Sequence, residues 1–276
     1  MKLTQLRNAT LIVEAGPHRV LVDPMLAPAG AIPALKYATA RRRRNPLVDL
    51  PPGTDQRLNT VTHALITHCQ KGHFDHLDRA GAKWLRQRGI AVFCMEGDAD
   101  FLSGKGLTVR PLRENTRQPF LGGWVTPVPC LHGRGLVGRM MAHGHGYHLE
   151  WPDEPSLYLA GDTLLTDTVR QHLRERRPAV TVIPAGGARF DLGGDIIMGR
   201  EAALQVARLS AGRVVANHLE ALDHCPVSRA ELRDARDRAG LRQQLLIPED
   251  GETLVFEAES GTFGETDGEA LASTLG

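Results

Sequence analysis

Residues 67–78 read Thr-His-Cys-Gln-Lys-Gly-His-Phe-Asp-His-Leu-Asp. This segment holds three histidines and two aspartates within eleven residues, which is more than a loop needs for solubility. Imidazole nitrogens and carboxylate oxygens bind Zn²⁺, Mn²⁺ and Fe²⁺. At a helix N-terminus, His73, Asp75 and His76 share one short arc, so His73 can serve one metal while the other two serve a second. The segment therefore predicts a metal site rather than a surface loop with titrating histidines.

A strand precedes this segment and a helix follows it. Residues 61–67 are mostly apolar or β-branched, as in a buried strand. Residues 78–88 place apolar side chains among Arg and Lys, and the pattern ends at Gly89, which is typical of an amphipathic helix.

Three further apolar strands end in a metal-type side chain. His132 follows a predicted strand at 124–129, Asp162 follows one at 156–160, and His218 follows one at 214–216. Singly, a His or Asp at a strand end is more often a cap or turn residue. Four such ends in one chain are harder to explain as caps, so we expect them to meet in space.

The other elements alternate short strands with helices. Residues 1–23 predict two strands and a turn, and residues 24–58 predict a long irregular loop or lid. Further strands are expected at 90–94, 107–112, 146–150, 180–184 and 244–247, helices at 166–176, 199–210 and 229–239, and a terminal hairpin around 248–252. We predict one domain over residues 1–260 and a polar tail over 261–276.

Composition excludes several classes of protein. Hydrophobic residues make up 42% of the 276 residues, which supports a sizeable core rather than a disordered chain. Lys and Arg number 33 against 32 Asp and Glu, so no strong positive field favours nucleic acid or anionic lipid. The sequence has no run long enough to span a membrane, no apolar signal segment and no CxxC pair, so we expect a cytoplasmic protein.

The order of the motifs (His-x-Asp-His, strand-His, strand-Gly-Asp-Thr, strand-His) resembles the metallo-β-lactamase superfamily. The opening hairpin, with Arg7-Asn8-Ala9-Thr10 and Leu21-Val22-Asp23-Pro24, is similar to the branch that contains ascorbate-6-phosphate lactonase. The resemblance covers roughly residues 3–257. It implies an α/β fold, a four-layer αβ/βα sandwich of two mixed β-sheets flanked by helices, with a dinuclear metal site at one edge of both sheets.

The resemblance also implies a set of ligands for two divalent ions, Zn²⁺ first and Mn²⁺ or Fe²⁺ as alternatives: His68, His73 and His132 on one ion, Asp75, His76 and His218 on the other, and Asp162 bridging both. A hydroxide that bridges the ions would attack the substrate. Asp75 would orient that hydroxide and later pass a proton to the leaving group.

The loop departs from the family pattern, which is His-x-His-x-Asp-His, because four residues separate His68 from His73. Without a gap, Gln70 takes the place of the second histidine and Gly72 that of the aspartate, which would damage both sites. An insertion of three residues within 69–72 keeps every ligand and gives the following helix its usual length. We favour the insertion, with Gln70 as a further candidate that approaches a metal through its amide oxygen.

Several other side chains are candidates for supporting roles. Glu220 or Asp223 could accept the second N–H of a metal-bound imidazole. His224 either contacts substrate or is an exposed loop histidine, and Arg189 could meet an anion. Asp23 either supports a ligand or is a plain turn residue before a proline.

Two clusters have weaker interpretations. The run Arg41–Arg44 either attracts a phosphate or carboxylate of the substrate or is simply solvated. His143, His145 and His148 are predicted to share one face of an exposed or cleft-rim strand, outside the ligand set.

The leading hypothesis is a metal-dependent hydrolase that attacks an ester, lactone or phosphoester of a small, anionic substrate. The alternatives are a non-heme iron oxidoreductase of the same fold, or a metal-poor binding protein whose altered loop has lost an ion. A nuclease is weaker, because only the arginine run favours it. A homo-oligomer is possible, and no membrane partner is expected.

Overall fold

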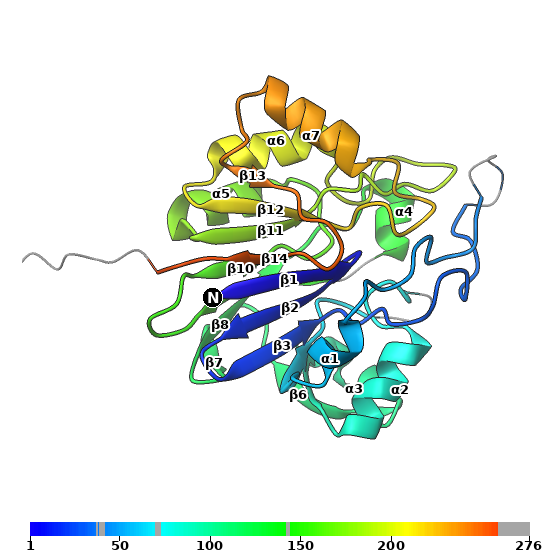
Figure 1. Cartoon of the computed structure of the whole chain (residues 1–276), viewed down its shortest axis with the longest axis vertical. Coiled ribbons are helices and arrows are strands. Elements are labelled where there is room, and N and C mark those ends of the chain that lie inside the picture. The colour runs from blue at the N-terminus through cyan, green and yellow to red at the C-terminus, as the bar shows by residue number, and fades with distance from the viewer. Residues whose placement is uncertain (37, 39–41, 70–72, 142–143, 259–276) are drawn as a thin grey trace, which may run out of the picture.

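Two β-sheets pack face to face in the computed structural model, which describes residues 1–36, 38, 42–69, 73–141 and 144–258 (Figure 1). The first sheet contains β1 (Lys2–Arg7), β2 (Thr10–Ala15), β3 (His18–Val22), β4 (His63–Leu65), β5 (Ala91–Met95), β6 (Thr108–Leu112) and β14 (Thr253–Val255). The second contains β7 (Gln118–Phe120), β8 (Gly123–Pro129), β9 (His145–Glu150), β10 (Leu157–Leu159), β11 (Val180–Pro184), β12 (Arg213–Asn217) and β13 (Leu245–Leu246).

Both sheets have the same plan. The strand orders are β14-β1-β2-β3-β4-β5-β6 and β13-β12-β11-β10-β9-β8-β7. In the first sheet, β14 to β3 pair antiparallel and β3 to β6 pair parallel. In the second, β7 to β10 pair antiparallel and β10 to β13 pair parallel. Each half thus joins an antiparallel part to a parallel part.

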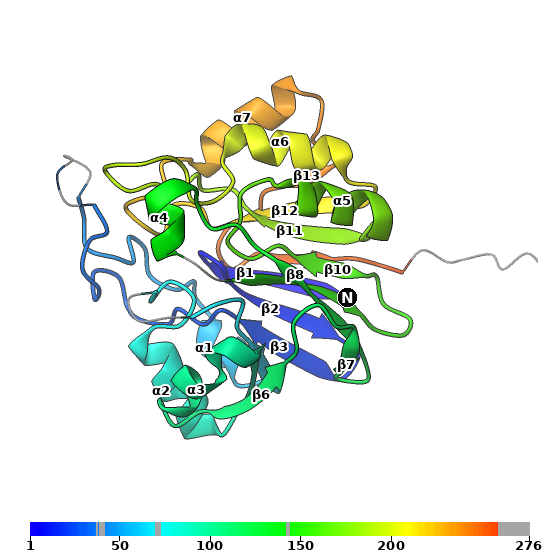
Figure 2. The same cartoon turned by 180° about the vertical axis from the view of Figure 1, so that it is seen from behind.

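Helices cover the outer faces of both sheets, as Figures 1 and 2 show. The first sheet carries α1 (Thr54–Leu58), α2 (Arg79–Arg88), the 3₁₀ helix η1 (Glu96–Asp98) and α3 (Ala99–Ser103). The second carries α5 (Asp167–Arg176), α6 (Arg200–Leu209) and α7 (Arg229–Arg238), while α4 (Gly135–Met140) lies at the end where the loops gather. The predicted four-layer sandwich is confirmed.

Side-chain alternation explains this layering. In β2, Leu11 and Val13 point into the core between the sheets, whereas Ile12 packs outward with Leu58 of α1. Both faces are therefore buried, which is why the sequence of β2 is almost continuously apolar. The second sheet uses the same arrangement, with Val182 facing the first sheet and Ile183 facing the helices.

Local capping fixes where α2 begins. The Asp78 carboxylate accepts a hydrogen bond from the N–H of Gly81 at 2.7 Å, and Gly89 ends the helix in a left-handed conformation. The same carboxylate accepts from the N–H of Ala27 at 2.6 Å, so one aspartate holds both the helix and the start of the long loop. The motif that precedes α2 is thereby anchored at its C-terminal end.

The described residues of the loop at 24–58 are largely irregular, as predicted, except for α1 and a bridge between Ile32 and Asn45. A buried arginine of β1 holds the two ends of this loop. The Arg7 guanidinium donates to the carbonyl oxygens of Met25, Ala27 and Val48 at 2.7 to 2.9 Å. Because these three carbonyls are the acceptors of a buried cation, moving the loop away would leave the Arg7 guanidinium without hydrogen-bond partners.

Two predictions about the ends of the chain were wrong. Residues 1–23 form three strands rather than two, because the polar residues of β1 concealed its pairing with β2. The expected hairpin around 248–252 does not form, since β13 pairs with β12 and β14 pairs with β1 in the other sheet. The predicted tail at 261–276 lies outside the described residues, and the single domain over 1–260 stays a prediction. No helix within the described residues has the length and apolar character needed to cross a membrane.

Candidate metal centre

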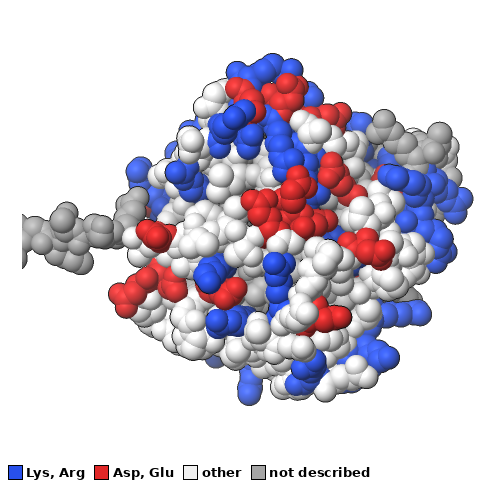
Figure 3. Space-filling view, in the orientation of Figure 1, with Lys and Arg blue, Asp and Glu red and all other residues white. Residues whose placement is uncertain are grey.

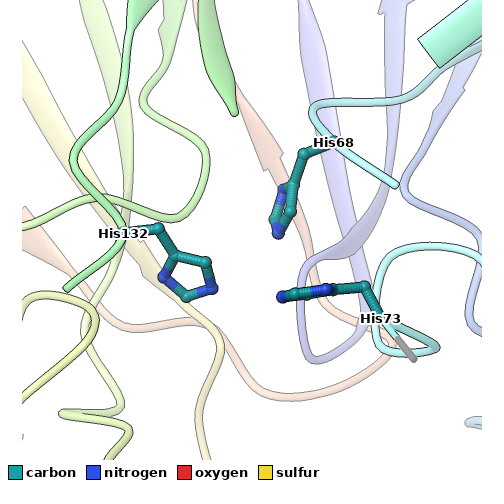
Figure 4. A group of neighbouring side chains, drawn as sticks. All are labelled: His68, His73 and His132. Atoms are coloured by element: carbon teal, nitrogen blue, oxygen red, sulfur yellow. The ribbon is translucent and has the colours of Figure 1, made fainter. Parts of the chain in front are cut away.

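Seven of the predicted ligands gather at one end of the sandwich in two adjoining groups. The first group is His68, His73 and His132, and the second is Asp75, His76, Asp162 and His218. Within each group, the ligand atoms lie within 4.8 Å of one another. Figure 4 shows the three imidazoles of the first group converging, two from the loop after β4 and His132 from the segment after β8. Both groups therefore have the spacing needed to hold an ion.

Both halves of the molecule contribute to these groups. His68, His73, Asp75 and His76 follow β4 of the first sheet, whereas His132, Asp162 and His218 follow β8, β10 and β12 of the second sheet. A hydrogen bond joins the halves beneath the groups, because Tyr147 Oη donates to the carbonyl of Ile66 at 2.9 Å. The carboxyl ends of parallel strands are the usual place for a site in such sheets.

Asp162 lies between the two groups. Its Oδ2 is 3.7 Å from His132 Nε2 in the first group, 3.1 Å from His76 Nε2 and 3.4 Å from His218 Nε2 in the second. This central position is the one that a bridging carboxylate requires. Gly161 allows it, because its φ is +64° and a Cβ there would lie 3.0 Å from the carbonyl oxygen of His145.

The imidazoles face the centre through one nitrogen and are held through the other. Five Nε2 atoms are buried and make no well-aligned hydrogen bond among the described residues, although those of His76 and His218 lie 3.1 and 3.4 Å from Asp162 Oδ2: His68, His73, His76, His132 and His218. The Nδ1 atoms of four of them contact a polar partner, which is Thr67 Oγ1 for His68, Asp23 Oδ2 for His76, the Ile196 carbonyl for His132 and Cys225 Sγ for His218. Buried nitrogens without partners are costly, so this donor set fits divalent ions that would complete it.

Burial and charge give the two groups different protonation. Burial lowers the pKa of His68 well below its ordinary value and also lowers the pKa of His73, so both rings favour the neutral form that binds metal. Burial would lower the pKa of His76 too, but the Asp162 carboxylate and its neighbours outweigh it and raise that pKa well above its ordinary value. Burial would raise the pKa of Asp75, yet His76 and its neighbours hold it well below its ordinary value. The second group therefore keeps ionised carboxylates in a buried site, where a cation is favoured.

Asp23 supports the ligands rather than only making a turn. Its carboxylate accepts from His76 Nδ1 at 2.8 Å and from both the N–H and the hydroxyl of Thr67 at 2.8 and 2.7 Å. It is only 2% exposed. Asp23 and His218 both adopt left-handed backbone angles, with φ of +46° and +57°. Such conformations are uncommon for non-glycine residues and cluster at functional sites.

The structure corrects the predicted partners of His218. Glu220 accepts instead from the backbone N–H and the guanidinium of Arg229, both at 2.8 Å. Asp223 bonds to the long loop, described below, and the His218 Nδ1 lies 3.4 Å from Cys225 Sγ. The reason is geometric, because the turn after His218 directs both carboxylates away from its ring. Gln70 lies outside the described residues, so its candidacy stays a prediction.

His224 lies beside the centre rather than in an exposed loop. Its ring is 3% exposed and stacks on Phe190 with an interplanar angle of 17°, and its centroid is 6.4 Å from that of His218. Burial lowers the pKa of His224 to about 4. The Arg189 side chain is exposed nearby, and its backbone N–H donates to the carbonyl of His224 at 3.0 Å.

The prediction that three histidines share one exposed face of β9 was wrong. His145 and His148 are an odd number of residues apart, so they point to opposite faces of the strand. His148 is buried, and its Nδ1 lies 3.2 Å from His172 Nε2 of α5. His143 lies outside the described residues.

Sequence reasoning missed two residues at the centre, Asn8 and Cys225. The Asn8 carbonyl accepts from the N–H of His218 at 3.0 Å, while its side-chain amide donates to the carbonyl of Asp75 at 3.3 Å. Its left-handed φ of +56° at a strand turn is typical of Asn, and that propensity was the available signal. Nothing in the spacing of Cys225 indicated its contact with His218.

Comparison with known proteins gives the family. No family model matches the chain. The UPF0173 protein YddR of Bacillus subtilis (strain 168) is 33% identical to it, over 93% of this chain and 100% of the relative. The chain belongs to the UPF0173 family. A UPF0173 metal-dependent hydrolase of Azorhizobium caulinodans is 30% identical, over 79% of this chain and 85% of that relative.

Solved structures extend the comparison of this UPF0173 chain. The isothiocyanate hydrolase from Delia radicum gut bacteria is 33% identical, with a TM-score of 0.84 over 94% of this chain and 100% of that one. The metallo-β-lactamase fold protein YhfI from Bacillus subtilis is 12% identical, with a TM-score of 0.61 over 92% and 98%, which supports the fold alone. The chain thus belongs to a family of metal-dependent hydrolases and has the metallo-β-lactamase fold, as its motifs predicted. The narrower likeness to ascorbate-6-phosphate lactonase stays a prediction.

Proposed function

We propose that the protein hydrolyses an ester, lactone or phosphoester of a small anionic substrate with two divalent ions held by the seven ligands. The observation that carries this proposal is the position of Asp162 between two adjoining donor groups. Three imidazoles in one group and two carboxylates with two imidazoles in the other match the preferences of Zn²⁺, with Mn²⁺ and Fe²⁺ as alternatives.

Two ions bound there would supply a hydroxide near neutral pH, because divalent ions lower the pKa of bound water. The protein's own contribution is orientation. The Oδ2 of Asp75 lies 3.7 Å from His76 Nε2 and 3.6 Å from His218 Nε2, so this carboxylate faces the centre. Because its pKa is low, Asp75 stays ionised and accepts a hydrogen bond from the attacking water. As the oxygen of that water bonds to the substrate, Asp75 would take up its proton and then hand it to the leaving group.

Metal content and substrate turnover test this proposal. Protein purified without chelator should contain about two divalent ions per chain by elemental analysis, a stoichiometry expected from two complete donor groups. A panel of lactones, carboxylic esters and phosphodiesters should then identify a substrate whose hydrolysis stops on chelation and returns with metal. Fewer than one ion per chain together with no hydrolysis would favour the metal-poor binding protein, whereas bound iron with oxygen uptake would favour the oxidoreductase.

A second candidate reaction is the hydrolysis of an isothiocyanate. It is favoured by the 33% identity to an isothiocyanate hydrolase over nearly the whole of both chains. The central carbon of an isothiocyanate is electrophilic, so addition of water and loss of carbonyl sulfide would release the amine. The partly exposed Phe74 and Phe190, which pack on an apolar cluster that includes Met25 and Leu222, would contact the organic group.

Benzyl isothiocyanate is a direct probe of this second reaction. Its disappearance should be matched by benzylamine, one for one, and should depend on the bound metal. Loss of the probe without benzylamine would instead indicate adduct formation with a protein nucleophile and would reject this reaction.

A further inference from the structure

A groove of about 720 Å³ opens between the long loop and residues 220–228. The loop contributes Lys36 and Arg43 to its walls, and Arg189 lies on the other side. Figure 3 shows Lys and Arg side chains gathered at the right-hand edge of the molecule, where Figure 1 places this loop. The groove is thus lined by three cations although the whole chain carries a formal charge of only +1.

The inner end of the groove reaches the metal centre through His224. This residue lines the groove, and its ring is edge-on to that of His218. Its Nδ1 is buried and has no hydrogen-bond partner in the described part of the chain. One imidazole ring, that of His224, thus lies between the groove and a candidate ligand.

The acidic residues of the groove are already engaged, which leaves two of its cations available. Glu220 is paired with Arg229 at 2.8 Å, and Lys36 Nζ lies 3.8 Å from an Asp191 carboxylate oxygen. For Arg43 and Arg189, no carboxylate lies within ion-pair distance among residues 1–36, 38, 42–69, 73–141 and 144–258. Two exposed guanidinium groups on opposite walls suit an anionic group, because guanidinium binds carboxylate and phosphate through paired N–H donors.

Asp223 fixes the wall that carries Arg43. Its carboxylate accepts from the backbone N–H groups of Leu35, Lys36 and Arg43 at 3.1 to 3.3 Å, and from the side-chain amide of Asn45 at 3.0 Å. The Asn45 side chain returns a bond, since its Oδ1 accepts from the N–H of Asp223 at 2.9 Å. The loop wall is therefore held to the segment that follows His218.

We propose that this groove binds a carboxylate or phosphate group of the substrate between Arg43 and Arg189, and so aligns the bond to be cleaved with the metal centre. This inference rests on the proposed hydrolysis of a small anionic substrate and names the residues that select the anion. Asp223 acts as a positioning residue that keeps Arg43 at the groove.

Two matched esters test the proposal by activity. Mono(4-nitrophenyl) glutarate carries a free carboxylate, and 4-nitrophenyl butyrate does not. Arg43→Gln and Arg189→Gln should each lower kcat/KM for the glutarate ester by about tenfold, at the lower end for a lost charge-assisted hydrogen bond because both side chains are exposed. The butyrate ester should change less than twofold. Arg208→Gln, an exposed arginine of α6 outside the groove, is the matched control and should change neither.

Binding measurements keep the proposal testable if neither ester is a substrate. Titration calorimetry with glutarate and, separately, with inorganic phosphate should show weaker binding in Arg43→Gln and Arg189→Gln than in Arg208→Gln. Weaker glutarate binding alone points to a carboxylate substrate, and weaker phosphate binding alone to a phosphorylated one. Equal binding of both anions by all three variants would overturn the groove proposal while leaving the proposed hydrolysis intact.

Discussion

The two halves of the molecule follow the same strand plan but supply their ligands in different ways. The first half provides four ligands within nine residues of one loop, between β4 and α2. The second half provides three ligands from the ends of three strands, at positions 132, 162 and 218. The geometry of the first set depends on local backbone, whereas that of the second depends on the register of a sheet.

The halves also differ in what holds the ligands. In the first half, His76 is bonded to the Asp23 carboxylate, which is itself bonded twice to Thr67. In the second half, His132 is bonded to a backbone carbonyl and His218 contacts a thiol. A carboxylate partner makes an imidazole a stronger ligand than a neutral partner does. Both halves therefore supply ligands, but the first half strengthens His76 with a carboxylate, whereas His132 and His218 have neutral partners.

The largest effect is expected where the halves meet. Replacing Asp162 with Ala removes the carboxylate between both groups, so both ions should bind more weakly and activity should fall to background. Metal content after dialysis, measured beside activity, checks this. If only one ion is lost, Asp162 belongs to one group and the halves are less coupled than we infer.

Asp75→Ala tests the first half alone, whose four ligands lie in one loop. Turnover should fall by about 10²–10⁴-fold, the usual range for a group that handles the proton, with the fold intact by circular dichroism. The three histidines of the first group remain in this variant, so one ion should still bind. Asp100→Ala, an exposed aspartate of α3, is the control and should keep full activity. Unaltered turnover in Asp75→Ala would reject the mechanism.

The third prediction compares the two kinds of supporting partner. Asp23→Asn should lower metal affinity or activity by about 10–100-fold, because it replaces the carboxylate behind His76 with a neutral amide. Cys225→Ser should lower them by less than about threefold, because a thiol is only a weak hydrogen-bonding partner. Metal titration of both variants measures the difference. Equal losses would show that the halves are tuned alike.

The smallest effect is expected from a histidine pair in the second half, the buried His148 and the half-buried His172. Burial lowers the pKa of both His148 and His172 to about 4 from an ordinary value of 6.5. The folded state therefore resists protonation that the unfolded chain accepts, so this contribution to stability is present above pH 6.5 and is lost as the pH falls towards 4.

The slope of stability against pH gives the readout for that pair. Urea midpoints measured between pH 7 and pH 4 should fall less steeply for His148→Gln than for the unaltered protein, whatever the absolute stability of the variant. The nearby charges of Arg176 and Glu150 are common to both proteins. Equal slopes for the two proteins would mean that other groups determine the loss of stability between pH 7 and pH 4.

The four ligands of the first half are the part of the site that the sequence predicts best. The spacing of His73, Asp75 and His76 is visible in a single loop, and the cap at Asp78 confirms where the helix begins. The ligands of the second half are predicted only by the order of the motifs, because nothing in the sequence around His132 or His218 distinguishes a ligand from a turn residue.

The supporting contacts were the hardest to predict, since they join residues that are distant along the chain. Asp23 and His76 are 53 positions apart, and Asp223 and Asn45 are 178 apart. The predicted contact of Glu220 with a metal-bound imidazole does not form, because its closeness to His218 in sequence says nothing of the direction of its side chain. The pairing of β14 with β1 was not predicted either, because these two strands are also distant along the chain.

Asn8 touches one ligand segment from each half, through His218 and Asp75, which are themselves more than a hundred positions apart. The first turn of the chain therefore touches both ligand segments, although it supplies no ligand itself. The metal centre is complete only where three segments distant along the chain are in place together, so its affinity for metal reports on the integrity of the whole fold.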